Sequence, residues 1–326
     1  MNARTNLPLD QLQAWVLSTY QRLERLDVPV FDAARSATAR KLARRVGPAT
    51  LYQLPTDLPT ALFPLGDWLA QRAAPVQPAL GPGRALSLLM RYLASPLRYE
   101  PYAESAVHKG VPSARCLYPL AFYIVRRTGG VLRAYEYVPE HHALRPVPFE
   151  GADLPPQADA ALVCVARAWR IAEKYGEFAN FPCVLEAGHA FSQFGHLGRM
   201  LGLNCGAPIA REFGRPLCRN AFELPLYAAC LALGPWELEA ELASAEARLS
   251  SFEPNPGLAE LFPRLAPIND LFDQGGAPFA PAQRPVPYEG PGLDVLETIR
   301  RRSAGNDRSG VAAVRRDVAP ASVLGT

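Results

Sequence analysis

The sequence lacks any long hydrophobic run. Its longest apolar stretch, residues 224–234, falls far short of the roughly 20 residues that a membrane-spanning helix needs. Residues 1–8 show no basic segment followed by an apolar one, as a signal peptide would. We therefore expect a cytoplasmic protein with no membrane contact.

An excess of charge of one sign is also missing. The 34 basic and 31 acidic residues leave a net charge of +3, and no basic stripe is interleaved with aromatic residues. This balance argues against a nucleic acid as partner. The 6 cysteines form no Cys-x-x-Cys pair, so we expect free thiols, with neither a zinc site nor a disulfide framework.

Phosphate-binding glycine motifs are absent too. No Gly-x-Gly-x-x-Gly follows a predicted strand and there is no Walker loop, so we expect no dinucleotide-binding fold. What remains is a chain of 326 residues that is 49% apolar and 20% charged. These values are typical of a globular protein with one large or two ordinary domains.

The chain divides into four predicted regions. Residues 1–85 carry helical spacing at 9–26, 32–46 and 60–72 and show no chemistry, so they are expected to pack on the core or on a partner. Residues 86–236 form the core. Residues 237–290 are a helix and a proline-rich linker, because nine of the 33 prolines fall between Pro254 and Pro291, a stretch expected to form no regular element. Residues 291–326 form the last region.

The core alternates strands with helices, which predicts an α+β fold with a mixed sheet. Gly129 and Gly130 separate two strand-like segments, so residues 117–138 are predicted to form a β-hairpin. Short apolar runs of the buried-strand type occupy 161–166 and 224–233, and residues 181–203 are predicted to form a helix buried on most sides.

Two segments carry the strongest functional pattern. Residues 112–120 read Pro-Ser-Ala-Arg-Cys-Leu-Tyr-Pro-Leu. Residues 173–177 read Glu-Lys-Tyr-Gly-Glu and precede Leu-Glu-Ala-Gly-His at 185–189, with Gln193 following. Their order and separation resemble the nitroreductase-like flavoproteins, and within them the SagB-type dehydrogenases, which oxidise peptide azolines to azoles. The resemblance implies a nitroreductase-like sheet flanked by helices, an FMN cofactor and a homodimer.

The resemblance also implies roles for individual residues. Ser113, Leu117 and Tyr118 would lie against the flavin ring. Arg115 stands where the family has glycine, so it either prevents a close backbone approach or offers a cation to the flavin. On the helix, Glu186 and Gln193 would face the flavin edge. The alternatives are a plain loop, a polar stripe satisfied within the core, and a Glu-x-x-His metal site, for which a second motif is missing.

Lys174 and Tyr175 are the candidate catalytic pair. Azoline oxidation needs a base for a carbon-bound proton, and a free tyrosine, with a pKa of about 10, needs a neighbouring cation in a dry pocket to serve near neutral pH. The alternative is an exposed lysine beside a packing tyrosine. Residues 178–181 read Phe-Ala-Asn-Phe where the family often has Arg-Ala-Tyr-Arg, which leaves the substrate or phosphate contacts of those arginines in doubt.

Residues 299–303 read Ile-Arg-Arg-Arg-Ser, which resembles the opening of a nitroreductase domain. There, Arg301 and Ser303 would hold the FMN phosphate. We expect either a truncated tandem protein, with 291–326 opening an incomplete second module, or a tail that folds back to complete a phosphate site. The alternative is a basic helix end that binds nothing.

The sequence thus predicts an FMN-dependent oxidoreductase that oxidises azoline rings in a modified peptide. A small-molecule substrate is also compatible with it. Two alternatives stay open: a general NAD(P)H-dependent flavin reductase, and a flavin-free scaffold in a peptide-modification complex.

Overall fold

The computed structural model describes residues 51–70, 80–100, 106–156, 158–203, 208–236, 265–274 and 294–297. The predicted helices at 9–26 and 32–46 lie outside these ranges. The strands are β1 (Tyr52–Gln53), β2 (Pro96–Tyr99), β3 (Val107–Lys109), β4 (Leu120–Thr128), β5 (Val131–Val138), β6 (Ala143–Val147), β7 (Ala160–Arg167), β8 (Pro208–Ile209) and β9 (Glu223–Leu231). The α-helices are α3 (Leu65–Leu69), α5 (Pro82–Ala94), α6 (Trp169–Tyr175), α7 (Asn180–Met200) and α10 (Leu265–Gln274). The 3₁₀ turns are η1 (Ala114–Cys116), η2 (Gly176–Ala179) and η3 (Arg211–Leu217).

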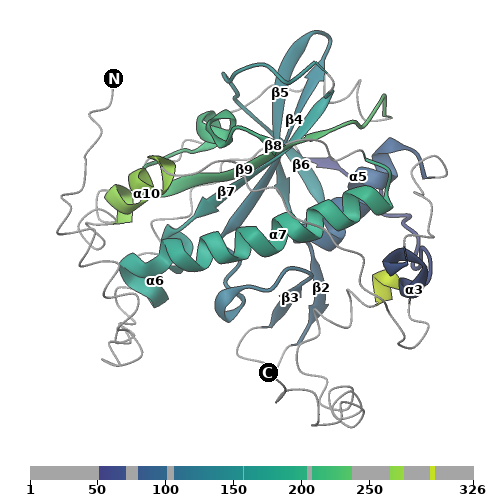
Figure 1. The fold of residues 1–326 in the computed structure, drawn as a ribbon, viewed down its shortest axis with the longest axis horizontal. Coiled ribbons are helices and arrows are strands. Elements are labelled where there is room, and N and C mark those ends of the chain that lie inside the picture. Colours follow the sequence, from purple (N-terminus) through teal and green to yellow (C-terminus); the bar gives the residue numbers. More distant parts are fainter. Residues whose placement is uncertain are drawn as a thin grey trace, which may run out of the picture.

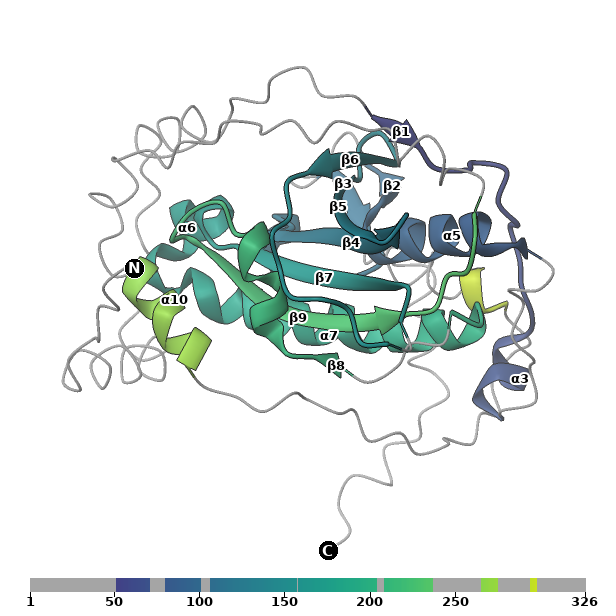
Figure 2. The same cartoon turned by 90° about the horizontal axis from the view of Figure 1, so that it is seen from above.

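A 7-stranded sheet in the order β1-β6-β5-β4-β7-β9-β8 forms the centre of the molecule (Figures 1 and 2). The α+β prediction is confirmed, although each pairing among the described strands is antiparallel where we expected a mixed sheet. The predicted hairpin is present as β4 and β5, with Thr128 opposite Val131. Gly129 and Gly130 close it with φ of 59° and 81°, values that suit a two-residue turn and that glycine adopts without strain.

The two faces of the sheet are covered differently. On one face, alternate residues of β4 and β7, such as Ile124 and Leu162, pack with α5 and α7 in the main core cluster. On the other face, Tyr123 and Val163 pack with Phe213 of η3 in a second cluster. Figure 2 shows α7 running along one side of the sheet. This alternation is what the strand periodicity of the sequence predicts.

The long predicted helix is confirmed as α7, with bounds one to three residues from those expected. The expectation that it is buried on most sides was wrong. Phe181 and Leu185 are 37% and 53% exposed, and Gly188, His189 and Ser192 on the same side of the helix are exposed too. The reason is geometric: α7 lies on one face of the sheet, and only the side toward the sheet is covered.

Segments outside the predicted core join it. In the N-terminal region, α3 lies within the predicted helix at 60–72, but β1 pairs with β6 and extends the sheet. Near the other end, Val295 and Leu296 are buried in the main core cluster, and the Leu62 backbone N–H donates to Asp294 Oδ2 at 2.9 Å. The first described residues of the 291–326 region therefore fold back on the N-terminal segment.

The expectation that residues 254–291 contain no regular element was wrong at α10. Pro267 is the third residue of this helix, where its missing N–H costs no intrahelical bond. Leu265 and Ile268 are buried, which anchors the helix beside β9 and η2. Among the described helices, none combines the length and apolar character that crossing a membrane requires.

Candidate functional site

The loop at 112–120 has an unusual backbone. Arg115, Cys116 and Tyr118 have φ of 52°, 53° and 48°, in the left-handed region that side chains other than glycine seldom adopt. Arg115, which is exposed, stands where the resembled family has glycine. Residue 115 thus has a backbone conformation that glycine adopts easily, although the residue here is arginine. Such strain, of order 1–3 kcal/mol at each position, gathers at functional sites.

Ser113 and Glu186, predicted separately to serve one site, are in contact. Ser113 Oγ donates to Glu186 Oε1 at 2.8 Å, and the Ala114 backbone N–H donates to the same oxygen at 2.8 Å. Burial raises the pKa of Glu186 from 4.5 to about 7, against these hydrogen bonds and the nearby Lys109 ammonium, which lower it. The structure therefore brings the two motifs together at a carboxyl group that can exchange a proton near neutral pH.

Tyr118 connects this loop to Lys109. Its hydroxyl accepts the Lys109 backbone N–H at 2.9 Å, and the Lys109 Nζ lies 4.9 Å from the centre of the Tyr118 ring. Burial, and to a smaller extent Arg170, lower the pKa of Lys109 from 10.5 to about 8, against Glu140 and Glu186, which raise it. Lys109 is thus a desolvated cation that contacts the loop at 112–120, called the Ser113 loop below, and also lines a neighbouring cavity.

That cavity has a volume of about 500 Å³, within the range of small-molecule sites. Lys109, Arg145, Arg167 and Arg170 line it, with Glu136 and Glu140 as the opposing acids. Glu136 is fully engaged by arginines. The charged groups of Lys109 and Arg170 have no hydrogen bond or salt bridge to another described residue, and the Lys109 ammonium contacts only the face of the Tyr118 ring. The cavity therefore has a surplus of positive charge that suits a phosphate or carboxylate group.

A buried ionic cluster underlies the cavity, and the sequence analysis missed it. Glu136 is 3% exposed and accepts from Arg167 Nη2 at 2.6 Å, from Arg219 Nη2 at 2.7 Å and from Arg145. These cations hold the pKa of its carboxyl well below the usual value despite burial. A signal was present: Glu136 falls in phase with the apolar residues Leu132 and Ala134 of its strand, and a carboxylate there needs buried cations.

Lys174 and Tyr175, the predicted catalytic pair, end α6 and are half-buried. Tyr175 and Leu117 pack against the same small apolar cluster. Lys174 lies four residues after Arg170, on the same side of the helix. Neither residue lines the 500 Å³ cavity. Their catalytic role remains a prediction.

Gln193 takes no part in the Ser113–Glu186 contact. Gln193 Nε2 donates to the Tyr92 carbonyl oxygen at 2.6 Å, so it joins α7 to α5. Its predicted contact with a flavin stays a prediction. Arg301 and Ser303 lie outside the described residues. For the Glu-x-x-His metal site, which was only an alternative, the described ranges contain no group of three or more His, Cys, Asp or Glu side chains that could hold an ion.

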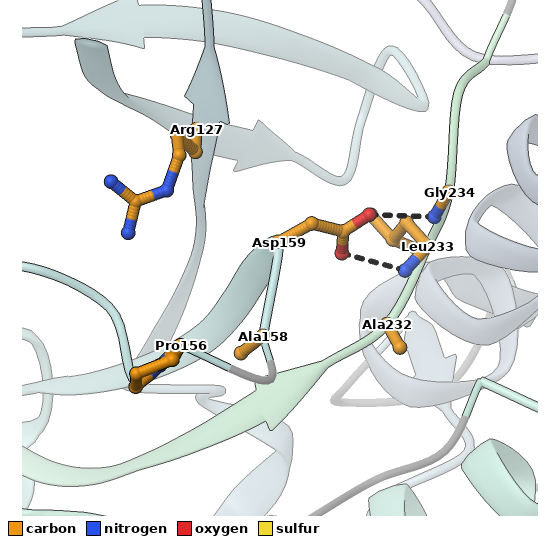
Figure 3. A pocket seen from close by; sticks show the side chains of 7 residues that line it. All are labelled: Arg127, Pro156, Ala158, Asp159, Ala232, Leu233 and Gly234. Atoms are coloured by element: carbon orange, nitrogen blue, oxygen red, sulfur yellow. Dashed lines mark hydrogen bonds between the residues drawn. The ribbon is translucent and has the colours of Figure 1, made fainter. Parts of the chain in front are cut away.

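A second cavity, of about 600 Å³, lies at the opposite end of β4 and β7 (Figure 3). Asp159 accepts the backbone N–H groups of Leu233 and Gly234 at 2.8 and 2.7 Å. Arg127 at its rim pairs with Asp153 at 2.8 Å. Since these charged groups already have partners in the protein, this cavity offers no chemistry comparable to the first one.

No protein-family model matches the chain, and no curated protein matches it. Several solved structures are similar to it, and three of them are as follows. A nitroreductase-type protein from Ralstonia eutropha is 19% identical with a TM-score of 0.44, covering 60% of this chain and 95% of its own. One from Anabaena variabilis is 16% identical with a TM-score of 0.42, covering 71% of this chain and 45% of its own.

The third is the Escherichia coli microcin synthetase McbBCD complex with truncated pro-MccB17 bound. It is 14% identical with a TM-score of 0.34, covering 71% of this chain and 98% of the matched chain. With 45% of the Anabaena protein covered, this chain spans less than half of that protein's length. All three identities and TM-scores are low.

Proposed function

We propose that this protein is an FMN-dependent oxidoreductase that oxidises azoline rings in a modified peptide. The observation that carries the proposal is the contact between Ser113 and Glu186. It joins the Pro-Ser-Ala-Arg-Cys-Leu-Tyr-Pro segment to the Leu-Glu-Ala-Gly-His helix, 73 positions apart. The strained backbone of the loop and the acid with a pKa of about 7 support an active site at the same place.

The cavity beside the loop fits the anionic end of the cofactor. Lys109 and Arg170 would hold the FMN phosphate, since both line the cavity and neither charged group forms a salt bridge with a described residue. FMN, when bound, would supply the hydride acceptor. Its ring would have to reach the loop at 112–120, where the Ser113 hydroxyl and the Ala114 N–H are already engaged by Glu186.

Two side chains of this protein would remove the proton from the azoline ring carbon. Tyr175 would take it from the azoline ring carbon, and the adjacent Lys174 ammonium would stabilise the resulting phenolate. Both are half-buried rather than exposed, as such a role requires. Glu186 would act as a positioning residue, because its carboxyl keeps the Ser113 loop attached to α7.

We also propose a homodimer. The exposed side chains of Phe181 and Leu185 and the small Gly188 and Ser192 form one face of α7, which offers an apolar surface for a second copy. A two-fold arrangement would place the α7 helices of both copies together. The proposal predicts a dimeric mass by light scattering.

A flavin-free scaffold is the second candidate, and the same loop favours it. The N–H groups of Cys116 and Leu117 donate to the carbonyls of Ser113 and Ala114, and the Tyr118 N–H donates to Ser113 Oγ. Those donors are thus satisfied within the loop and are not directed at a ligand. A general NAD(P)H-dependent flavin reductase would share the FMN site and differ in its reductant.

FMN titration of the purified protein separates these candidates. The oxidoreductase proposal predicts a retained visible flavin band, or saturable quenching of FMN fluorescence. Arg170→Gln should weaken FMN binding, whereas Arg84→Gln, at a surface pair with Asp57, should leave it unchanged. A protein that neither retains FMN nor binds added FMN would exclude both flavin-dependent candidates and leave the scaffold.

A further inference from the structure

A cluster of reactive side chains beside the Ser113 loop takes no part in the proposed redox chemistry. Cys116 Sγ lies 3.9 Å from His108 Nδ1. The other nitrogen of that ring, Nε2, lies 3.1 Å from Glu100 Oε2. A thiol, an imidazole and a carboxylate are therefore aligned in the order that nucleophilic cysteine sites use.

The contact with Glu100 fixes the role of each ring nitrogen. An ionised carboxylate only accepts hydrogen bonds, so the Nε2 of His108 must carry the hydrogen of this bond. In the neutral ring, Nδ1 is then the acceptor, and it faces the thiol. Glu100 Oε1 pairs with Arg98 Nη2 at 2.5 Å, which leaves Oε2 for His108. His108 is therefore oriented as a base toward Cys116.

The backbone holds all three groups in place. Glu100 and His108 belong to the β2–β3 hairpin, where the Glu100 N–H donates to the Ala106 carbonyl at 2.7 Å. Cys116 has the left-handed φ of 53°, fixed by a bond from its N–H to the Ser113 carbonyl at 3.1 Å. His108 is buried, whereas Cys116 is half-exposed, so the base is shielded from solvent more than the cysteine is.

We propose that Cys116 is a nucleophilic cysteine with His108 as its general base and Glu100 as its positioning residue, and that it accepts an activated acyl group such as a thioester or an aryl ester. The Cys116 sulfur forms a bond to the acyl carbon while the bond to the leaving group breaks. The thiol proton passes to His108 Nδ1 and then to the leaving group. Water can release the acyl group as a carboxylic acid, and nothing is oxidised or reduced.

The other described cysteines lack this arrangement. Cys164, Cys183 and Cys230 are buried. Cys218 is half-exposed like Cys116, but its thiol faces the Gly214 carbonyl at 3.9 Å, and burial raises its pKa to about 12. Cys218 is therefore a control cysteine of the same exposure class with no base beside its thiol.

The test uses p-nitrophenyl acetate and the full-length protein. Wild type should release p-nitrophenolate in a burst of one equivalent, and mass mapping should place the acetyl group on Cys116. Cys116→Ser should abolish the burst and Cys218→Ser should preserve it. His108→Ala should slow it about a hundredfold, the usual contribution of a general base, and added imidazole should partly restore the rate. No burst in folded wild type, or one kept by Cys116→Ser, overturns the proposal.

A second measurement guards against variants that fail to fold. Limited iodoacetamide labelling of wild type, read for each cysteine by peptide mapping, should modify Cys116 well before Cys218. Equal rates at these two positions would contradict the proposal. Glu100→Gln keeps an acceptor without the charge, so it should slow the burst less than His108→Ala and respond less to imidazole. None of these readouts needs flavin, so they succeed or fail separately from the FMN proposal.

Discussion

Replacing Glu186 by glutamine shows how the ionisation of this one buried carboxyl group affects the stability of the fold. The amide oxygen of glutamine can still accept from Ser113 Oγ and the Ala114 N–H, the two donors that now meet Glu186 Oε1. The amide cannot ionise, however. Because Glu186 is 5% exposed, its charge is poorly solvated in the fold, and removing that charge should change how stability depends on pH.

The magnitude follows from the pKa. Burial raises the pKa of Glu186 from 4.5 to about 7, and each pKa unit corresponds to about 1.36 kcal/mol, which gives roughly 3 kcal/mol. Since the folded pKa is the higher one, the unfolded chain loses its proton first as pH rises. The stabilisation from the protonated group is complete below the unfolded pKa and is lost as the pH rises toward about 7.

Urea unfolding of both proteins at about pH 5 and about pH 8 measures the effect. Over that interval, the wild type should lose roughly 2.5 kcal/mol relative to Glu186→Gln. The difference between the two proteins removes the contribution of other titrating groups. Parallel pH dependence in wild type and variant would refute the conclusion that Glu186 is protonated in the fold near neutral pH.

Three further predictions address the ionic cluster, the proposed dimer and the cationic cavity. Glu136→Gln should lower the free energy of unfolding by about 3–5 kcal/mol in urea titrations, because it leaves buried arginines unpaired. A loss below about 1 kcal/mol would mean that water replaces the carboxylate. Leu185→Asp should convert the dimer to a monomer in light scattering, whereas Arg84→Gln should not, and a monomeric wild type would contradict the dimer. Lys109→Met should weaken FMN binding but not riboflavin binding, and equal losses would exclude a phosphate contact.

Much of the fold could be predicted because strand and helix periods report burial directly. The hairpin could be predicted from Gly129 and Gly130, and α7 from its helical pattern. The prediction of no regular element at 254–291 failed because tertiary packing stabilises helix α10 there. Pro267 is tolerated in α10 because it occupies the first turn and its neighbours are buried, and no local pattern reports that.

The sequence could mark candidate site residues, but it could not predict their contacts. Spacing could mark Ser113 and Glu186 but could not show that they bind each other rather than a ligand. The cluster around Glu136 assembles arginines from β6, β7 and the segment after η3, so only the fold brings them together. The same holds for Cys116 and His108, whose alignment depends on the β2–β3 hairpin and a left-handed residue.

Anaerobic mixing of the FMN-loaded protein with a thiazoline-containing peptide tests the central claim most directly. We predict that the visible flavin band bleaches in a single turnover and that the peptide gains an azole ring. Tyr175→Phe should retain FMN yet abolish bleaching, and Lys174→Ala should slow it. A protein that binds no FMN, or bound FMN that stays oxidised with the peptide, would contradict the proposed activity.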